Sequence, residues 1–190
     1  DMQFSEILAT PNMEAIFGRD DYGRSIIFRL FEGFKNSIEI ILVVSLISCT
    51  TGVVIGTLSG YIGGKFDAIV SFIINLFMSF PGILLAIAFA AMLNPGKLNL
   101  ILALSIGGWV SYARLSRGQA LMVRNFEYVK ASRAMGASHW WIVGRHVIPS
   151  LSTPLLVEAT YAVAGLIIAE ASLSFLGLGL QAPEASWGAM

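Results

Sequence analysis

The chain has 190 residues, of which 56% are hydrophobic and only 13% are charged, whereas about 25% of the residues in a typical soluble domain carry a charge. The 12 basic and 12 acidic side chains cancel, so no net field recruits nucleic acid. The single cysteine, Cys49, lies inside an apolar run, which excludes a disulfide framework and a cysteine metal cluster. The composition predicts an all-α integral membrane protein, a polytopic helix bundle in the lipid bilayer.

Four apolar runs predict four membrane-spanning helices. Residues 40–58 and 68–93 contain no charge, and the first run alone covers about 28 Å as a helix, close to the thickness of the hydrocarbon core. Residues 98–113 form a shorter run, and residues 147–169 form a fourth that only Glu158 interrupts.

Lysine and arginine residues orient these helices, because cytoplasmic loops are rich in them. Residues 114–145 contain six lysine and arginine residues and one acidic residue, Glu127. The four basic residues within residues 1–36 are fewer, so residues 114–145 decide the orientation. The predicted organisation follows the chain: an outer segment (1–36), three membrane helices (37–113), a cytoplasmic loop (114–148), a fourth membrane helix (149–170) and an outer loop (171–190). Lys65 and Asp67 then lie on the cytoplasmic side.

The first span carries a small residue at every fourth position: Ser48, Gly52, Gly56 and Gly60. On a helix, this spacing forms a groove that lets another backbone approach closely. It predicts a tight helix–helix contact, either within the bundle or between subunits.

Polar and helix-breaking residues in the spans mark a candidate translocation pathway: Asn75, Ser79, Pro81 and Glu158. Pro81 predicts a kink, either a hinge beside the pathway or a static bend, and Asn75 and Ser79 share a helix face. Glu158 costs at least about 2.5 kcal/mol at mid-bilayer. It therefore contacts substrate, relays protons, or is a neutral acid bonded to a neighbouring helix. Glu170 is expected to reach the membrane interface.

The cytoplasmic loop predicts a helix–turn–helix. Asn125 can cap a first helix, on which Phe126, Val129 and Ala134 are spaced as one apolar stripe. Gly136 can adopt the left-handed conformation that ends it.

Ser138 is the natural cap of the second helix, and Pro149 suits the first turn of the following span. Such a basic segment could lie on the membrane surface or dock into a partner's groove. Composition alone leaves both readings open.

The loop resembles the conserved cytoplasmic loop of permease subunits in ATP-binding cassette importers. That family pattern is Glu-Ala-Ala, three residues, Gly, and about nine residues later Ile-x-Leu-Pro. The matching positions here are Lys130, Ala131, Ser132, Gly136, Ile148 and Pro149. Lys130 replaces the leading Glu, Ser132 the second Ala, and His146 the first Ile of the closing motif.

Three other segments resemble the dipeptide, oligopeptide and nickel branch of that family: FGRDDYGRS (17–25), GYIGGKFD (60–67) and ASLSFLGLGLQAPEASWGAM (171–190). The resemblance implies six membrane helices in the full subunit. Because no initiator methionine stands at its start, the chain is expected to be an internal piece of that subunit. The resemblance also suggests that residues 22–34 form an amphipathic outer helix.

The resemblance implies a permease subunit of a peptide importer in the bacterial or archaeal cytoplasmic membrane, with nickel as the alternative substrate. Its partners would be a second homologous permease, two cytoplasmic ATP-binding subunits and an extracytoplasmic substrate-binding protein. The residues expected to dock onto the ATPase are Phe126, Glu127, Val129, Lys130, Ala131, Ser132, Ala134, Met135, Gly136, Ala137, Ile148 and Pro149.

No catalytic residue, metal site or bound cofactor is expected in this chain. ATP-Mg would bind to the partner subunits, because the phosphate-binding pattern fails where Phe66 follows Gly64 and Lys65. His139 and His146 stand about 10 Å apart along a helix, too far to share one metal ion, and are expected at an interface. An ion-coupled secondary transporter built around Glu158 is the alternative from another class, but it leaves the structured loop unexplained.

Overall fold

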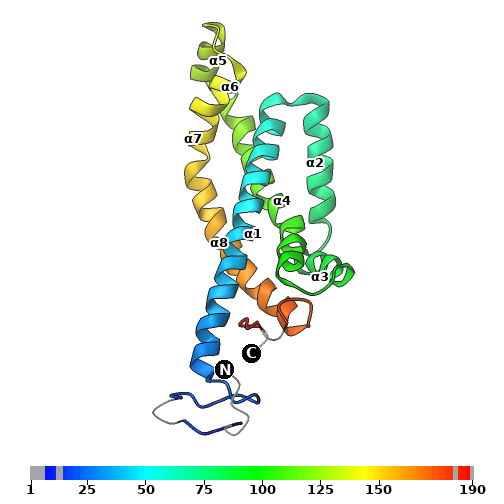
Figure 1. Ribbon diagram of the computed structural model, residues 1–190. Coiled ribbons are helices and arrows are strands. Elements are labelled where there is room, and N and C mark those ends of the chain that lie inside the picture. Colours follow the sequence, from blue (N-terminus) through cyan, green and yellow to red (C-terminus); the bar gives the residue numbers. More distant parts are fainter. Residues whose placement is uncertain (1–6, 12–14, 182–183, 189–190) are drawn as a thin grey trace.

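The computed structural model describes residues 7–11, 15–181 and 184–188, which are almost entirely helical (Figure 1). The elements in chain order are α1 (Ile26–Ile62), α2 (Gly64–Met78), α3 (Gly82–Met92), α4 (Lys97–Val123), α5 (Glu127–Ala134), α6 (His139–Ile142), the π-helical turn η2 (Val143–Val147), α7 (Ile148–Ser150) and α8 (Ser152–Phe175). By length and composition, α1, α4 and α8 can each cross a membrane, and the bent pair α2–α3 is a possible fourth span. The predicted all-α membrane fold is confirmed.

The helices are longer than the apolar runs. α1 has 37 residues and is about 55 Å long. The outer helix expected over residues 22–34 is therefore not an element of its own, because residues 26–34 are the first part of α1. No glycine or proline lies between residues 34 and 51 to break the helix. α4 likewise continues past Ala113 to Val123, and α8 runs from Ser152 to Phe175.

The second expected span is broken rather than kinked. α2 and α3 meet at 87°, because the chain cannot pass through Pro81 as a helix. The carbonyl of Phe77 accepts from the Phe80 N–H at 3.3 Å, which ends α2. The carbonyl of Pro81 then accepts from Leu84 and Leu85, which starts α3.

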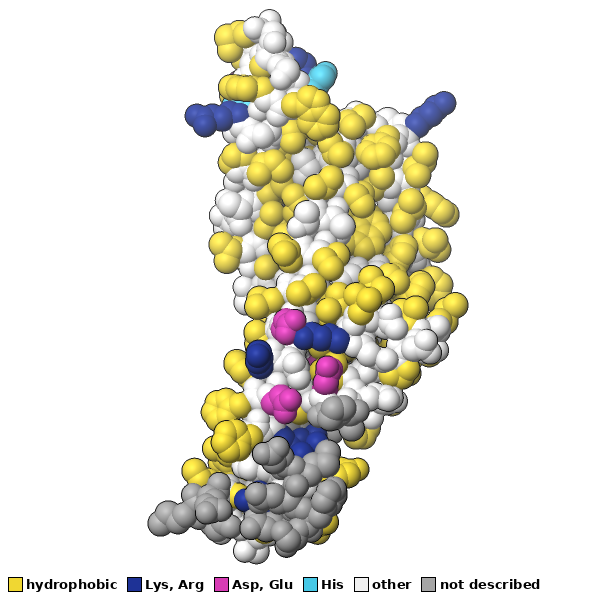
Figure 2. Space-filling model, in the orientation of Figure 1, with side chains coloured by type: hydrophobic (Ala, Val, Ile, Leu, Met, Phe, Trp, Pro, Cys, Tyr) yellow, Lys and Arg dark blue, Asp and Glu magenta, His cyan; other side chains and the backbone are white. Residues whose placement is uncertain are grey.

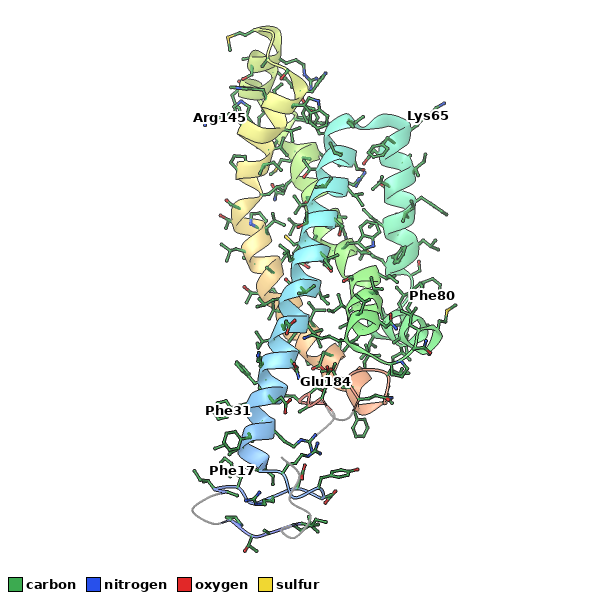
Figure 3. The ribbon with its side chains drawn as sticks, in the orientation of Figure 1. Phe17, Phe31, Lys65, Phe80, Arg145 and Glu184 are labelled. Atoms are coloured by element: carbon green, nitrogen blue, oxygen red, sulfur yellow. The ribbon has the colours of Figure 1, made fainter. Side chains whose placement is uncertain are left out.

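The turn between α1 and α2 lies at the same end of the bundle as α5 and α6 (Figure 1). Gly63 and Gly64 form this turn with φ of +76° and +62°, values that residues with a Cβ rarely adopt. Lys65 follows it and lies at the same end as Arg145 (Figure 3), while the segment before α1 lies at the other. The turn at Lys65 and the loop that contains Arg145 thus share one end of the bundle (Figure 3).

α1 packs against α4 along its stripe of small residues. A Cβ added to Gly52 would lie 2.5 Å from the carbonyl oxygen of Trp109, and Cβ atoms on Gly56 and Gly60 would collide with the α4 backbone. Ser48 faces Gly108 of α4 in the same way. The close contact is therefore made within the chain. Beside it, an apolar core joins α1, α3, α4 and α8 around Ile40, Val44, Leu100, Leu104 and Leu173.

Apolar side chains form a broad band across the bundle, and the charged side chains visible in this view lie on either side of that band, near its upper end and in its lower half (Figure 2). α8 is the least covered helix, since only 6% of its most apolar window is buried. A helix this apolar is not stable in water, so lipid or other protein helices must cover it.

Candidate functional site

The two short helices α5 and α6 pack on the ends of α1 and α4. Val129 of α5, Ile142 of α6 and Val147 of η2 are buried, in one apolar cluster with Tyr61 of α1 and Val123 of α4. The helix–turn–helix, residues 127–147, is therefore fixed to the membrane helices by a core of its own. We call it the docking unit.

The turn of the docking unit has the predicted chemistry. Gly136 has φ +88°, and the N–H groups of Gly136 and Ala137 donate to the carbonyls of Arg133 and Ser132, each at 3.0 Å. This pair of hydrogen bonds is the Schellman motif that ends a helix. Ser138 caps α6, because its hydroxyl accepts from the Trp141 N–H at 3.3 Å. Pro149 lies in α7, a three-residue helix, and not in the first turn of the span as predicted, because the span α8 begins only at Ser152.

The start of α5 differs from the prediction. The N-cap residue is Phe126, and Asn125 instead donates to the carbonyl of Leu121 at 2.8 Å, so its amide caps the end of α4. Of the expected apolar stripe only Val129 is buried, whereas Phe126 and Ala134 are exposed. Because α4 extends to Val123, Asn125 belongs to the end of α4 and α5 begins only after Phe126.

Tyr61 fastens the docking unit to the end of α1. Its hydroxyl accepts a hydrogen bond from Nη2 of Arg133 at 3.1 Å and lies 3.1 Å from Nδ1 of His139. Nη1 of Arg124 also donates to the carbonyl of Gly60 at 2.9 Å. In the sequence, Tyr61 stands out only as part of the segment GYIGGKFD. No local pattern predicts its contacts with Arg133 and His139, which are more than 70 positions away.

His146 joins the two halves of the docking unit. Its ring lies 5.1 Å from the ring of Tyr128 and 5.3 Å from that of Trp141, measured between centroids, and its Nε2 lies 3.4 Å from the hydroxyl of Ser132. Both histidines are thus packing residues at interfaces, as expected from their spacing.

The docking unit exposes large apolar side chains beside charged ones. Met135 and Trp140 are 82% and 74% exposed. Most of the residues expected to contact an ATPase share this exposure: Phe126, Glu127, Lys130, Ala131, Ala134, Met135, Gly136, Ile148 and Pro149. Val129 and Ser132 instead face the inside of the unit, and Ala137 is half-buried.

A charged clamp that sequence reasoning missed ties three helices together near the docking unit. Arg117 of α4 donates to both oxygens of Asp67 on α2, from Nε at 2.6 Å and from Nη2 at 2.7 Å. The hydroxyl of Ser59 on α1 donates to the same carboxylate at 2.6 Å. A two-pronged pair of this kind fixes orientation as well as distance.

A cavity of about 490 Å³ lies beside the break between α2 and α3. Ser48 of α1, Phe80 and Gly82 at the break, and Glu158 and Tyr161 of α8 are among its lining residues. Glu158 is its only charged side chain, and no described residue donates a hydrogen bond to its carboxylate. Asn75 and Ser79 do not line this cavity; both are exposed on α2, where Ser79 donates to the carbonyl of Asn75 at 2.9 Å.

The family described as "Binding-protein-dependent transport system inner membrane component" matches residues 52–190. The chain belongs to this family. Like other inner membrane components, it is a multi-pass membrane protein.

Several curated relatives of this inner membrane component are peptide permeases. The chain is 40% identical over 183 residues to the probable D,D-dipeptide transport system permease protein DdpC of Escherichia coli (strain K12), covering 96% of this chain and 61% of that protein. It is 39% identical over 180 residues to the dipeptide transport system permease protein DppC of Bacillus subtilis (strain 168), covering 95% and 56%. The chain thus spans about three fifths of the length of these relatives. A chain of the inward-facing MetNI methionine ABC transporter has the same fold, with a TM-score of 0.73 and 24% identity over 86% of this chain and 79% of that chain.

The expectation that Glu170 of this inner membrane component reaches the interface is wrong. Glu170 is 1% exposed and lies between α1 and α8, where the hydroxyls of Ser37 and Ser174 donate to its two oxygens at 3.1 and 2.8 Å. The apolar run alone placed it near a helix end, but α8 continues to Phe175 and the chain after it folds back over this point. Asn36 of α1 holds that returning segment by donating to the carbonyl of Ala185 at 2.9 Å.

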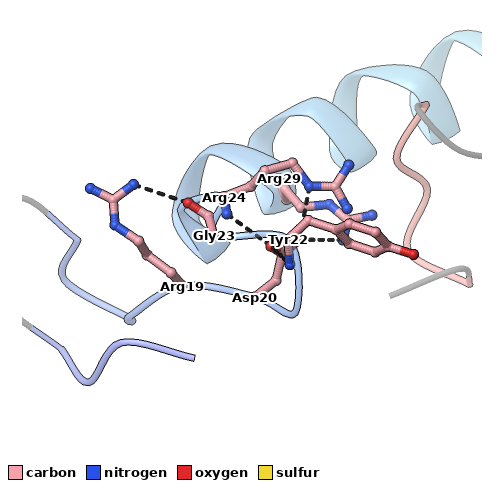
Figure 4. A network of polar contacts seen from close by, with 6 residues as sticks. All are labelled: Arg19, Asp20, Tyr22, Gly23, Arg24 and Arg29. Atoms are coloured by element: carbon pink, nitrogen blue, oxygen red, sulfur yellow. Dashed lines mark hydrogen bonds and ion pairs between the residues drawn. The ribbon is translucent and has the colours of Figure 1, made fainter. Parts of the chain in front are cut away.

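The segment before α1 in this inner membrane component is organised around Asp20 (Figure 4). Its carboxylate accepts from the backbone N–H groups of Tyr22 and Arg24 at 2.9 and 2.8 Å, and from the side chains of Arg24 and Arg29 at 3.0 and 2.8 Å. Burial alone would raise the pKa of Asp20, but the donors outweigh it and lower that pKa from 3.8 to about 2. The FGRDDYGRS motif is therefore a carboxylate-centred turn that leads into α1.

Proposed function

We propose that this chain is a pathway-forming permease subunit of an ATP-driven importer of di- and oligopeptides. It pairs with a second homologous permease and with two cytoplasmic subunits that bind ATP-Mg, and an extracytoplasmic binding protein delivers the substrate. The relatives named as dipeptide permeases support peptides over nickel. Within the described residues, no group of three or more metal-binding side chains favours the nickel alternative.

The observation that carries this proposal is the docking unit, a small rigid body with an apolar tip. Its inner face is locked to α1 by Tyr61 and to α4 by the cluster around Val123. At its turn it exposes Met135, and large apolar side chains exposed on a folded surface mark a protein contact. A partner that moved this tip would move the ends of α1 and α4 with it.

We propose further that the cavity beside the α2–α3 break is part of the translocation pathway. Glu158 is the charged group there, and a peptide presents an α-ammonium group of opposite sign. An unpaired carboxylate in an apolar setting attracts such a cation strongly. The proline break leaves backbone groups beside the cavity that α2 and α3 do not use, as is typical where a membrane helix borders a polar path.

Cross-linking from two matched positions tests the docking role. Met135 and Met92 are both methionines, 82% and 83% exposed, but Met92 ends α3, away from the docking unit (Figure 1). In the full complex with Cys49 replaced by Ser, Met135→Cys is expected to cross-link to the ATP-binding subunit and Met92→Cys is not. Cross-linking from neither position, or from Met92 alone, would refute the docking role.

Uptake into proteoliposomes tests the transport proposal. We expect peptide uptake to require ATP on the docking-unit side and to persist when the proton gradient is collapsed. Uptake that needs the gradient but no ATP would instead identify an ion-coupled carrier.

Glu158→Gln tests the pathway. It keeps the side-chain shape but removes the charge, so uptake of peptides with a free α-ammonium group is expected to fall at least tenfold, and Glu158→Asp is expected to retain most of it. Unchanged uptake by Glu158→Gln would leave this residue a structural role only.

A further inference from the structure

A second and larger cavity, about 610 Å³, lies between the docking unit and the ends of α1 and α4. Its walls come from both sides of this junction: Leu58, Tyr61, Ile62, Arg124, Asn125, Lys130, Arg133, His139, Trp140 and Val143. The proposed pathway does not use this space, and of the residues expected to dock onto an ATPase only Lys130 lines it.

The lining of this cavity is strongly basic. Arg124, Lys130 and Arg133 contribute three positive charges, His139 lies beside them, and no carboxylate lines the cavity. Among the described ion pairs, none involves these three cations. Arg124 and Arg133 donate to Gly60 and Tyr61, which are neutral. Asp67 interacts electrostatically with Arg124 from outside the cavity, but the cavity itself presents three cations and no described carboxylate, so it attracts an anion.

One wall of the cavity is apolar and belongs to a membrane helix. Leu58 and Ile62 occupy the last turns of α1, and Ile62 is 63% exposed. Trp140 borders the cavity from α6, and tryptophan is enriched at the level of lipid headgroups. The cations therefore lie at the end of a span, directly beside a surface suited to an acyl chain.

We propose that this cavity binds the phosphate of an anionic phospholipid of the cytoplasmic leaflet. The phosphate lies among Arg124, Lys130 and Arg133, because guanidinium groups pair with phosphate oxygens in a two-pronged geometry. The acyl chain follows Leu58 and Ile62 along α1. Basic pockets between membrane helices on the cytoplasmic side bind lipid headgroups in this way. The bound lipid would brace the docking unit against the end of α1.

The test uses the intact importer complex, stripped of lipid in detergent and titrated with phosphatidylglycerol while native mass spectrometry counts the retained lipid. Lys130→Gln is the informative variant, because the ammonium group of Lys130 makes no hydrogen bond or ion pair with a described residue, and its backbone bond to Phe126 is kept. We expect its affinity for phosphatidylglycerol to fall about fivefold, the contribution of one basic residue. Lys130→Arg should restore binding. Arg145→Gln, which removes a charge from the same loop but outside the cavity, should bind like the wild type.

Two comparisons on the wild-type complex identify the ligand without any variant. Phosphatidylcholine with the same acyl chains should bind at least tenfold more weakly than phosphatidylglycerol, and inorganic phosphate should not displace the lipid at millimolar concentration. Equal binding of the two lipids, or unchanged affinity in Lys130→Gln, would overturn the proposal. Displacement of the lipid by inorganic phosphate would show that the cavity binds a soluble anion, and it would overturn the proposal that the ligand is a phospholipid. The measurement requires no transport, so its failure leaves the proposed importer function untouched.

Discussion

Replacing Gly56 by alanine tests the contact between α1 and α4, on which the whole bundle depends. The new Cβ would lie 2.8 Å from both the Cα and the carbonyl carbon of Ala113, whereas carbon atoms in contact lie about 3.5–4.0 Å apart. The obstacle is backbone, which cannot turn aside as a flexible side chain can. The two helices must therefore separate locally by roughly 1 Å.

The cost of that separation follows from packing. Overpacking a close contact costs about 1–3 kcal/mol, and a gap of 0.5–1 Å forfeits about a quarter to a half of the dispersion attraction across it. Alanine also stabilises a helix over glycine by about 0.5–1 kcal/mol. We expect Gly56→Ala to lower the free energy of unfolding by about 2 kcal/mol net.

Gly118 of α4 provides the matched control, because a Cβ there would meet nothing within 4 Å. Gly118→Ala keeps only the helix-propensity gain and should raise the free energy of unfolding by about 0.5–1 kcal/mol. Both variants can be measured by reversible unfolding in mixed micelles of increasing SDS content, followed by tryptophan fluorescence. If Gly56→Ala is as stable as Gly118→Ala, the close contact between α1 and α4 does not exist.

Three further predictions concern polar contacts. Tyr61→Phe removes the hydroxyl that accepts a hydrogen bond from Arg133, so the free energy of unfolding should fall by about 1.5–2 kcal/mol. Amide hydrogen exchange should also become faster in α5 and α6. Unchanged exchange in these helices would show that Tyr61 does not hold the docking unit. Asp67→Asn leaves Arg117 without its counter-charge and should lower the free energy of unfolding by about 2 kcal/mol for this partly exposed pair, measured by the same unfolding assay. Arg117→Lys keeps the charge but loses the second hydrogen bond, so it should lower the free energy of unfolding by less. Equal losses in the two variants would argue against the two-pronged geometry. Because the pKa of Asp20 is lowered to about 2, its contribution to stability should be complete above pH 3.8 and be lost as the pH falls through about 2. The thermal midpoint of Asp20→Asn should therefore depend less on pH in this range than that of the wild type. Identical pH profiles of the two proteins would contradict the role of Asp20 in this turn.

The sequence predicted those features that depend on neighbouring residues. The turn at Gly136 and the cap at Ser138 both follow from backbone chemistry within a few residues. The small residues at 48, 52, 56 and 60 predicted close packing for the same reason, since their spacing alone sets the face. The partner helix could not be predicted, because every span offers an apolar surface.

The sequence could not predict features that join distant parts of the chain. A hydrophobic run shows where lipid can lie but not where the helix ends, so α1 and α4 extend beyond their runs into polar segments. Glu170 was misplaced for this reason, since its serine partner on α1 is 133 positions away. The pair Asp67–Arg117 and the contacts of Tyr61 are likewise set by tertiary packing, which overrides what the local pattern indicates.

The lengths of these helices determine which parts of the bundle can move. α1 is continuous from the Asp20 turn to Tyr61, about 55 Å, and its glycines are locked against α4, so the two helices move as one body with the docking unit. The angle between α2 and α3 depends on the residues around Pro81, where the helical hydrogen bonds are interrupted. α8 has few fully buried residues in its most apolar window and carries Glu158 on the cavity wall. In the proposed importer, a push on the docking unit would therefore act on the α1–α4 body and also on α8, which follows the docking unit through α7, and we expect the cavity that α1, α4 and α8 line to change width.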